Sequence, residues 1–101
     1  MEKTAKYRRK GRWSTLRRRF LEENRPKELE QMEKEGTLAE YLSDIEMEYS
    51  ERFSRMEDDQ LKRTQLEIRY GKGEINWQTY VGEFNQLRNS IYELLTEELC
   101  Q

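Results

Sequence analysis

The chain has 101 residues, of which 40% are charged and 34% are hydrophobic, and its 19 basic and 21 acidic residues give a net charge of −2. This length suits one small domain with a thin core. The sequence holds no His and a single Cys, which excludes His-based catalysis, His-ligated zinc and an internal disulfide. We therefore expect no enzyme activity, no metal site and no cofactor.

Two short helices are predicted before residue 36. Apolar residues at helical spacing predict the first one, over residues 14–24. The residues of this stripe are Trp13, Leu16, Phe20 and Leu21. Pro26 disfavours helical geometry at the residue before it and suits the first turn of a helix, so it predicts a break and a second helix over 26–35. Gly36 is expected to end that helix.

A long third helix is predicted over residues 38–56. Thr37 and Glu40 have the spacing of a capping box at its start. Its apolar face recurs every three or four residues. The residues of this face are Leu38, Tyr41, Leu42, Ile45, Tyr49, Phe53 and Met56. The acidic run at 57–59 is expected to bend or end the helix, and the two glycines of 71–73 to break the chain. Whether one helix or two precedes that break stays open.

A fourth helix is predicted over residues 77–99, with Asn76 as its N-cap. Its apolar stripe is the most regular in the chain, and it consists of Trp77, Tyr80, Val81, Phe84, Leu87, Ile91, Leu94, Leu95 and Leu99. We expect this helix to pair antiparallel with the 38–56 helix. The side chains expected to be substantially buried are Trp77, Phe84, Leu87 and Ile91. Glycine in a helix costs about 1 kcal/mol against alanine. Its presence at position 82 inside the stripe therefore predicts a close helix crossing, where a side chain would not fit.

Together these elements predict an all-α fold: a small helical bundle with a long antiparallel helix pair and two short N-terminal helices. We expect a flexible basic arm at residues 1–12 and a single helical domain at residues 13–101. Because the core is thin, a second copy of the chain or another partner could cover the remaining apolar surface.

Charge is distributed unevenly along the sequence. Residues 1–19 hold nine basic residues against one acidic residue, a net of +8, whereas residues 20–101 hold ten against twenty, a net of −10. A basic segment attracts phosphate groups. The candidate nucleic-acid-binding residues are Arg8, Arg9, Lys10, Arg12, Arg17, Arg18 and Arg19. Trp13 lies among them, and its spacing with the apolar stripe favours a role as an anchor over stacking on a base. A tail that folds back on the acidic body is the simpler alternative.

Several segments resemble the TnpV family of small proteins encoded on bacterial transposons and related mobile elements. The segments that carry the resemblance are Gly11-Arg12, Leu16-Arg17-Arg18-Arg19-Phe20-Leu21, Arg25-Pro26, Gly36-Thr37-Leu38 with Leu42 and Ile45, and Val81-Gly82-Glu83-Phe84-Asn85-Gln86-Leu87-Arg88-Asn89. The last is the most specific, and residues 57–79 depart from the pattern. The resemblance implies an accessory factor that binds DNA beside a recombinase, and it supplies no catalytic residues.

Three functions are compatible with these observations. The first is a non-enzymatic accessory protein of a mobile genetic element that contacts nucleic acid, DNA rather than RNA. The second is a protein-binding inhibitor of a host defence nuclease, similar to an anti-CRISPR protein, that uses the acidic helical body. The third is a basic amphipathic helix at residues 12–24 on anionic lipid. A recombinase or a host nuclease is the expected protein partner. No apolar run is long enough to span a membrane, and we expect a cytoplasmic protein.

Overall fold

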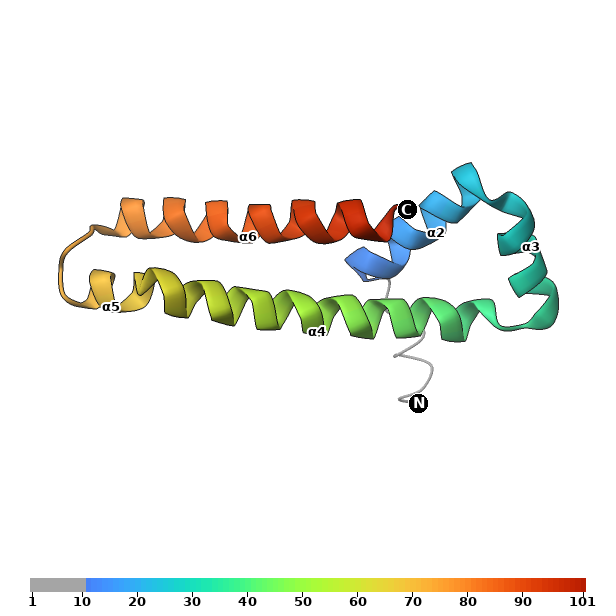
Figure 1. Cartoon of the computed structure of the whole chain (residues 1–101), viewed down its shortest axis with the longest axis horizontal. Helices are drawn as coiled ribbons and strands as arrows, with labels where there is room; N and C mark the ends of the chain where they lie inside the picture. The colour runs from blue at the N-terminus through green and yellow to red at the C-terminus, as the bar shows by residue number, and fades with distance from the viewer. Residues whose placement is uncertain (1–10) are drawn as a thin grey trace. The chain divides into compact units, whose positions relative to one another are not determined.

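The computed structural model describes residues 11–101, and over these residues the protein is built from helices alone (Figure 1). This confirms the predicted all-α class. The helices are α2 (Arg12–Asn24), α3 (Pro26–Glu35), α4 (Leu38–Thr64), α5 (Leu66–Gly71) and α6 (Trp77–Leu99). Residues 1–10 lie outside the described part, so the predicted division into an arm at residues 1–12 and a domain at 13–101 stays a prediction.

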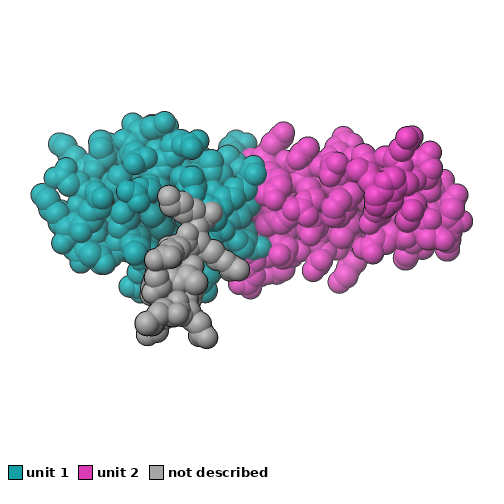
Figure 2. Space-filling view, turned by 180° about the vertical axis from the view of Figure 1, so that it is seen from behind, with its two compact units in different colours: residues 1–50, 96–101 teal, residues 51–95 magenta. Residues whose placement is uncertain are grey.

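The chain forms two compact units (Figure 2). Unit 1 contains the described residues up to Ser50 together with Thr96–Gln101, and unit 2 contains Glu51–Leu95. Each unit therefore takes part of α4 and part of α6. Unit 1 adds the two short helices α2 and α3, and unit 2 adds α5.

Unit 1 begins with the two helices that Pro26 separates, as predicted. Arg25 has φ −141° and ψ 57°, which is not helical, and Pro26 occupies the first position of α3. The chain changes direction at this point (Figure 1). Gly36, with φ 75°, ends α3. The Gly36 amide donates to the Glu33 carbonyl oxygen at 3.2 Å and the Thr37 amide to Met32 at 3.0 Å, which is a Schellman motif.

The core of this part of unit 1 comes from three helices. Leu21, Leu29 and Leu38 are buried together, one each from α2, α3 and α4. The partly buried residues packed against them are Phe20, Met32, Tyr41 and Leu42. The predicted start of α4 at Leu38 is confirmed. The predicted capping box is not formed, because the hydroxyl and the amide of Thr37 both donate to the Met32 carbonyl oxygen at the end of α3, at 3.5 Å and 3.0 Å.

Unit 2 is a hairpin of the last part of α4 and most of α6, closed by α5. The acidic run at 57–59 does not end α4, which continues to Thr64. Two of its carboxylates are paired, Asp59 with Arg63 at 3.1 Å and Glu57 with Arg88 of α6 at 2.9 Å. The break comes instead at Gln65, which has a left-handed φ of 52°. Residues 57–73 therefore form two helices.

The turn into α6 follows its sequence signals. Gly73 has φ 76°, and the Glu74 amide donates to the Arg69 carbonyl oxygen at 2.9 Å, which ends α5 in a second Schellman motif. Asn76 is the predicted N-cap, since its side-chain oxygen accepts a hydrogen bond from the Thr79 amide at 2.8 Å.

The core of unit 2 differs in part from the prediction. Ile91 is buried as expected, alongside Phe53, Leu66 and Leu95, whereas Phe84 and Leu87 are only partly buried. Trp77 is 60% exposed, so its predicted burial is wrong. Trp77 lies in the first turn of α6, and the rings of Tyr70 and Tyr80 lie beside it, at 5.8 Å and 5.7 Å between centroids.

The predicted close helix crossing at Gly82 is also wrong. A methyl group added at Gly82 would meet no atom within 4 Å. Glycine at this position therefore costs helix stability without allowing a close approach.

We expect Gly82→Ala to stabilise the protein by about 1 kcal/mol, because alanine loses less backbone entropy in a helix. Urea denaturation followed by circular dichroism measures the change. Gln86→Ala, at another exposed position of α6, is the control and should change the free energy of unfolding by less than about 0.5 kcal/mol. Destabilisation by Gly82→Ala would contradict the open surroundings of this residue.

Leu94 and Leu95 provide a matched pair for the core, because Leu95 is 0% exposed and Leu94 is 54% exposed. Leu95→Ala should destabilise the protein by about 2–5 kcal/mol through lost burial and a cavity, and Leu94→Ala by less than about 1 kcal/mol. Denaturation midpoints of the two variants measure the difference. Equal losses would show that the packing of α6 is wrong.

Candidate nucleic-acid interface

Helix α2 carries the basic residues of the described part of the N-terminal region, and its first turn is stabilised by a residue of α4. Gly11 precedes the helix and supplies no side-chain cap. The Glu46 carboxylate accepts a hydrogen bond from the Ser14 amide at 2.9 Å and another from the Ser50 hydroxyl at 3.1 Å. A carboxylate is favoured at a helix N-terminus by the helix dipole. The position of this carboxylate also accounts for the glycine at position 11, because a Cβ there would overlap the Glu46 carboxylate.

Trp13 anchors α2 to α4. Its side chain is 3% exposed, and the centroid of its ring lies 5.7 Å from that of Tyr49. Leu21, two turns later on the same stripe, is 2% exposed. A ring buried to this degree presents no face on which a base could stack, so the predicted anchoring role of Trp13 is the one that the geometry allows.

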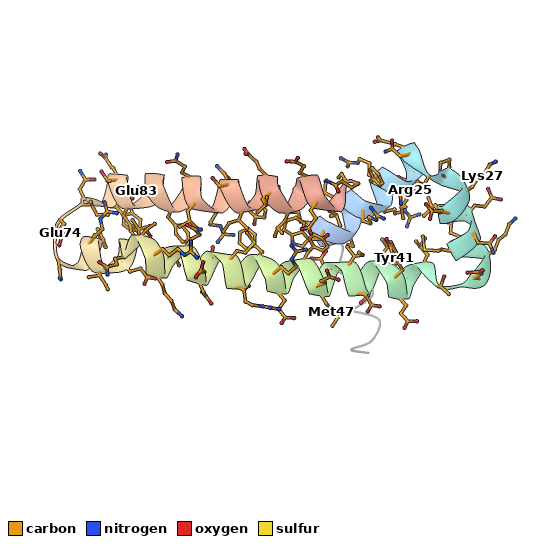
Figure 3. All side chains as sticks on the ribbon, in the orientation of Figure 1. Arg25, Lys27, Tyr41, Met47, Glu74 and Glu83 are labelled. Atoms are coloured by element: carbon orange, nitrogen blue, oxygen red, sulfur yellow. The ribbon has the colours of Figure 1, made fainter. Side chains whose placement is uncertain are left out.

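Arg17 lies at the edge of the buried face of α2, and its guanidinium bonds to groups of the protein itself. Its Nε donates to the Tyr41 hydroxyl at 2.9 Å, and its Nη1 donates to the carbonyl oxygens of Leu99 at 2.8 Å and Gln101 at 3.1 Å. Tyr41 points from α4 toward this region (Figure 3). Arg17 therefore supplies a positive charge at the C-terminus of α6, where the helix dipole favours a cation.

Arg18 and Arg19 lie on the solvent side of α2. Arg18 is half exposed and has Glu22 at 3.7 Å on the same helix, a surface pair worth at most about 1 kcal/mol. Arg19 is exposed. Arg12, at the start of the helix, is exposed too, and its guanidinium lies 5.7 Å from the centroid of the Trp13 ring.

The structure thus separates the predicted residues into three groups. Arg12, Arg18 and Arg19 are exposed on α2, while Arg17 is partly buried and bonded to the end of the chain. The remaining candidates, Arg8, Arg9 and Lys10, lie outside the described residues. Nucleic-acid binding by any of the seven stays a prediction.

Two further basic residues of unit 1 were not among the candidates. Arg25 and Lys27 lie on either side of Pro26, and both are exposed (Figure 3). The Arg25 guanidinium lies 5.4 Å from the centroid of the Phe20 ring and 3.6 Å from Glu28. Counting charge only to residue 19 missed them, although the sequence Arg25-Pro26-Lys27 places both beside a helix break and so at the surface.

Two arginines of unit 2 are held by carboxylates. Arg69 makes a two-pronged contact with Glu83, at 3.0 Å and 3.2 Å. These hydrogen bonds raise the pKa of Arg69 above its ordinary value. Arg88 donates to the Tyr92 hydroxyl, which raises the pKa of Arg88, and the nearby Glu57 carboxylate acts in the same direction. Both arginines remain charged and act as bridges between helices.

Other chemistry finds little support in the described part of the chain. Within residues 11–101 no group of three or more His, Cys, Asp or Glu side chains is arranged to hold a metal ion. None of the described helices combines the length and the apolar character that spanning a membrane requires.

Comparison with known proteins gives one family. The family model described as transposon-encoded protein TnpV matches residues 1–100. Searches of curated proteins and of solved structures return no match.

Arg17→Ala should destabilise the protein by about 1.5–3 kcal/mol, because hydrogen bonds from a charged donor are lost and two carbonyl oxygens lose their partner. Arg19→Ala removes the same charge two residues away and should change stability by less than about 0.5 kcal/mol. Thermal denaturation of both variants at one salt concentration gives the comparison. Similar melting temperatures would contradict the distinction between the two arginines.

Proposed function

Because the chain belongs to the TnpV family of transposon-encoded proteins, we propose that it is a non-enzymatic accessory protein of a mobile genetic element that contacts nucleic acid through its basic N-terminal region. The proposal concerns DNA in the cytoplasm, beside the recombinase of the element. No reaction is assigned to the chain itself.

The observation that supports the proposal is that different residues of α2 attach the helix to the protein and face solvent. Trp13 is buried and the guanidinium of Arg17 is bonded to groups of the protein, so the helix is held in place without using Arg18 and Arg19. A helix that is already held in place loses little backbone freedom when its guanidinium groups meet phosphates, so only the side chains have to be ordered. Residues 1–19 carry a net charge of +8, and this charge supports attraction to a polyanion.

Such contacts determine how the protein lies on the DNA and do not select a DNA sequence. Guanidinium groups on phosphate oxygens hold a protein on the duplex and carry no base information by themselves. Binding of this kind weakens steeply with salt, with a slope of about −0.9 in log–log form for each phosphate contact. A factor that holds DNA for a recombinase needs this kind of affinity, and the recombinase can supply the sequence preference.

A protein-binding inhibitor of a host nuclease is the second candidate. The observation in its favour is the row of exposed carboxylates that Glu40, Asp44 and Glu48 form at intervals of four residues on α4. Residues four apart lie on one face of a helix. A row of negative charges could meet the basic groove of a nuclease.

Salt-dependent DNA binding by the full chain tests the first candidate. The double variant Arg18→Ala/Arg19→Ala should keep its helix content and reduce the log–log salt slope by about 1.8, which corresponds to two phosphate contacts. Fluorescence anisotropy of a labelled duplex and a labelled single strand, measured over a salt series, gives the slope.

The matched control is Arg55→Ala/Arg63→Ala, which removes the same charge from exposed ion pairs on α4 and should leave the slope unchanged. An equal effect of both double variants would indicate a general response to net charge and contradict the assignment to α2. Absence of any DNA binding at low salt would overturn the proposal and favour the inhibitor.

A further inference from the structure

Three aromatic side chains gather at the turn between α5 and α6, within unit 2. The ring centroids of Tyr70, Trp77 and Tyr80 lie 4.9–5.8 Å from one another. We call these three residues the tip patch. Trp77 is 60% exposed and Tyr70 is 39% exposed. Exposed aromatic groups of this kind are typical of interaction sites, because their burial contributes strongly to association.

The charges around the tip patch show no excess of positive charge. Residues 66–77 contain Glu67, Arg69, Lys72 and Glu74, two of each sign, and Glu83 of α6 adds a third carboxylate beside Arg69. Arg69 is paired with Glu83, whereas Lys72 and Glu74 are exposed on the turn itself, where Figure 3 marks Glu74. A nucleic acid or an anionic membrane attracts a surface with excess positive charge, and this surface has none. The neutral aromatic patch therefore fits a protein surface.

We propose that a second copy of this chain covers the tip patch, in a two-fold arrangement that brings Lys72 of each copy to Glu74 of the other. A two-fold contact uses the same surface on both copies, so that each residue meets its counterpart reciprocally. One basic and one acidic residue beside an uncharged aromatic group satisfy that condition. The arrangement forms two ion pairs and buries both Trp77 side chains.

The size of the patch sets the strength of this dimer. A stable complex buries about 800 Å² on each partner, and three partly exposed side chains offer much less. The contact is therefore a weak, reversible one. The proposal does not depend on DNA binding, which involves residues of unit 1.

Sedimentation equilibrium of the full chain over a concentration series tests the contact. The parent chain should show a reversible monomer–dimer equilibrium. Trp77→Ala should raise the dissociation constant about tenfold or more, as expected for an aromatic residue at the centre of an interface. Leu94→Ala removes a similarly exposed apolar side chain elsewhere on α6 and should leave the constant unchanged.

A charge exchange tests the two-fold register. Lys72→Glu and Glu74→Lys should each weaken self-association, because each places like charges opposite one another twice. An equimolar mixture of the two variants should form a heterodimer more readily than either variant dimerises alone, since both ion pairs are restored. Circular dichroism verifies that each variant is folded. A chain that stays monomeric throughout, a dimer that Trp77→Ala leaves intact, or a mixture that does not associate would each overturn the proposal.

Discussion

The guanidinium of Arg17 joins segments that lie 82 residues apart in the sequence, and the arrangement of unit 1 depends on that contact. Unit 1 combines the described residues up to Ser50 with the last six residues of the chain. Bringing distant segments together costs conformational entropy, which the contacts at the junction must offset. The hydrogen bonds of Arg17 to the end of α6 and the burial of Leu99, which is 2% exposed, provide that compensation.

A second polar contact acts at the start of α2. Glu46 holds the first turn of the helix, and Arg17 holds the middle. An apolar stripe alone defines only roughly which way a short helix faces, since several rotations bury similar area. With a carboxylate at one point and a guanidinium at another, the rotation of α2 is defined, and this rotation is why Arg19 faces solvent while Arg17 does not.

Signals that act within a few residues were sufficient to predict much of the fold. Pro26, Gly36 and Asn76 each determine local backbone geometry, and the helices begin or end where these residues predicted. Features that depend on distant partners were not predictable in this way. Arg17 and Arg19 are chemically identical in the sequence, so the sequence could not predict that Arg17 bonds to Tyr41 and Leu99 and that Arg19 does not. The exposure of Trp77 likewise depends on residues that are not its neighbours in the sequence, such as Tyr70 of α5.

The break at Gln65 has a consequence for the timescales on which unit 2 opens. α5 has only six residues, far fewer than an isolated helix needs to persist in water. It exists because Leu66 is buried and Arg69 is bonded to Glu83, while the left-handed residue before it prevents helical order from propagating out of α4. The amide protons of α5 therefore exchange with solvent by local opening, independently of the long helices and well before the whole protein unfolds.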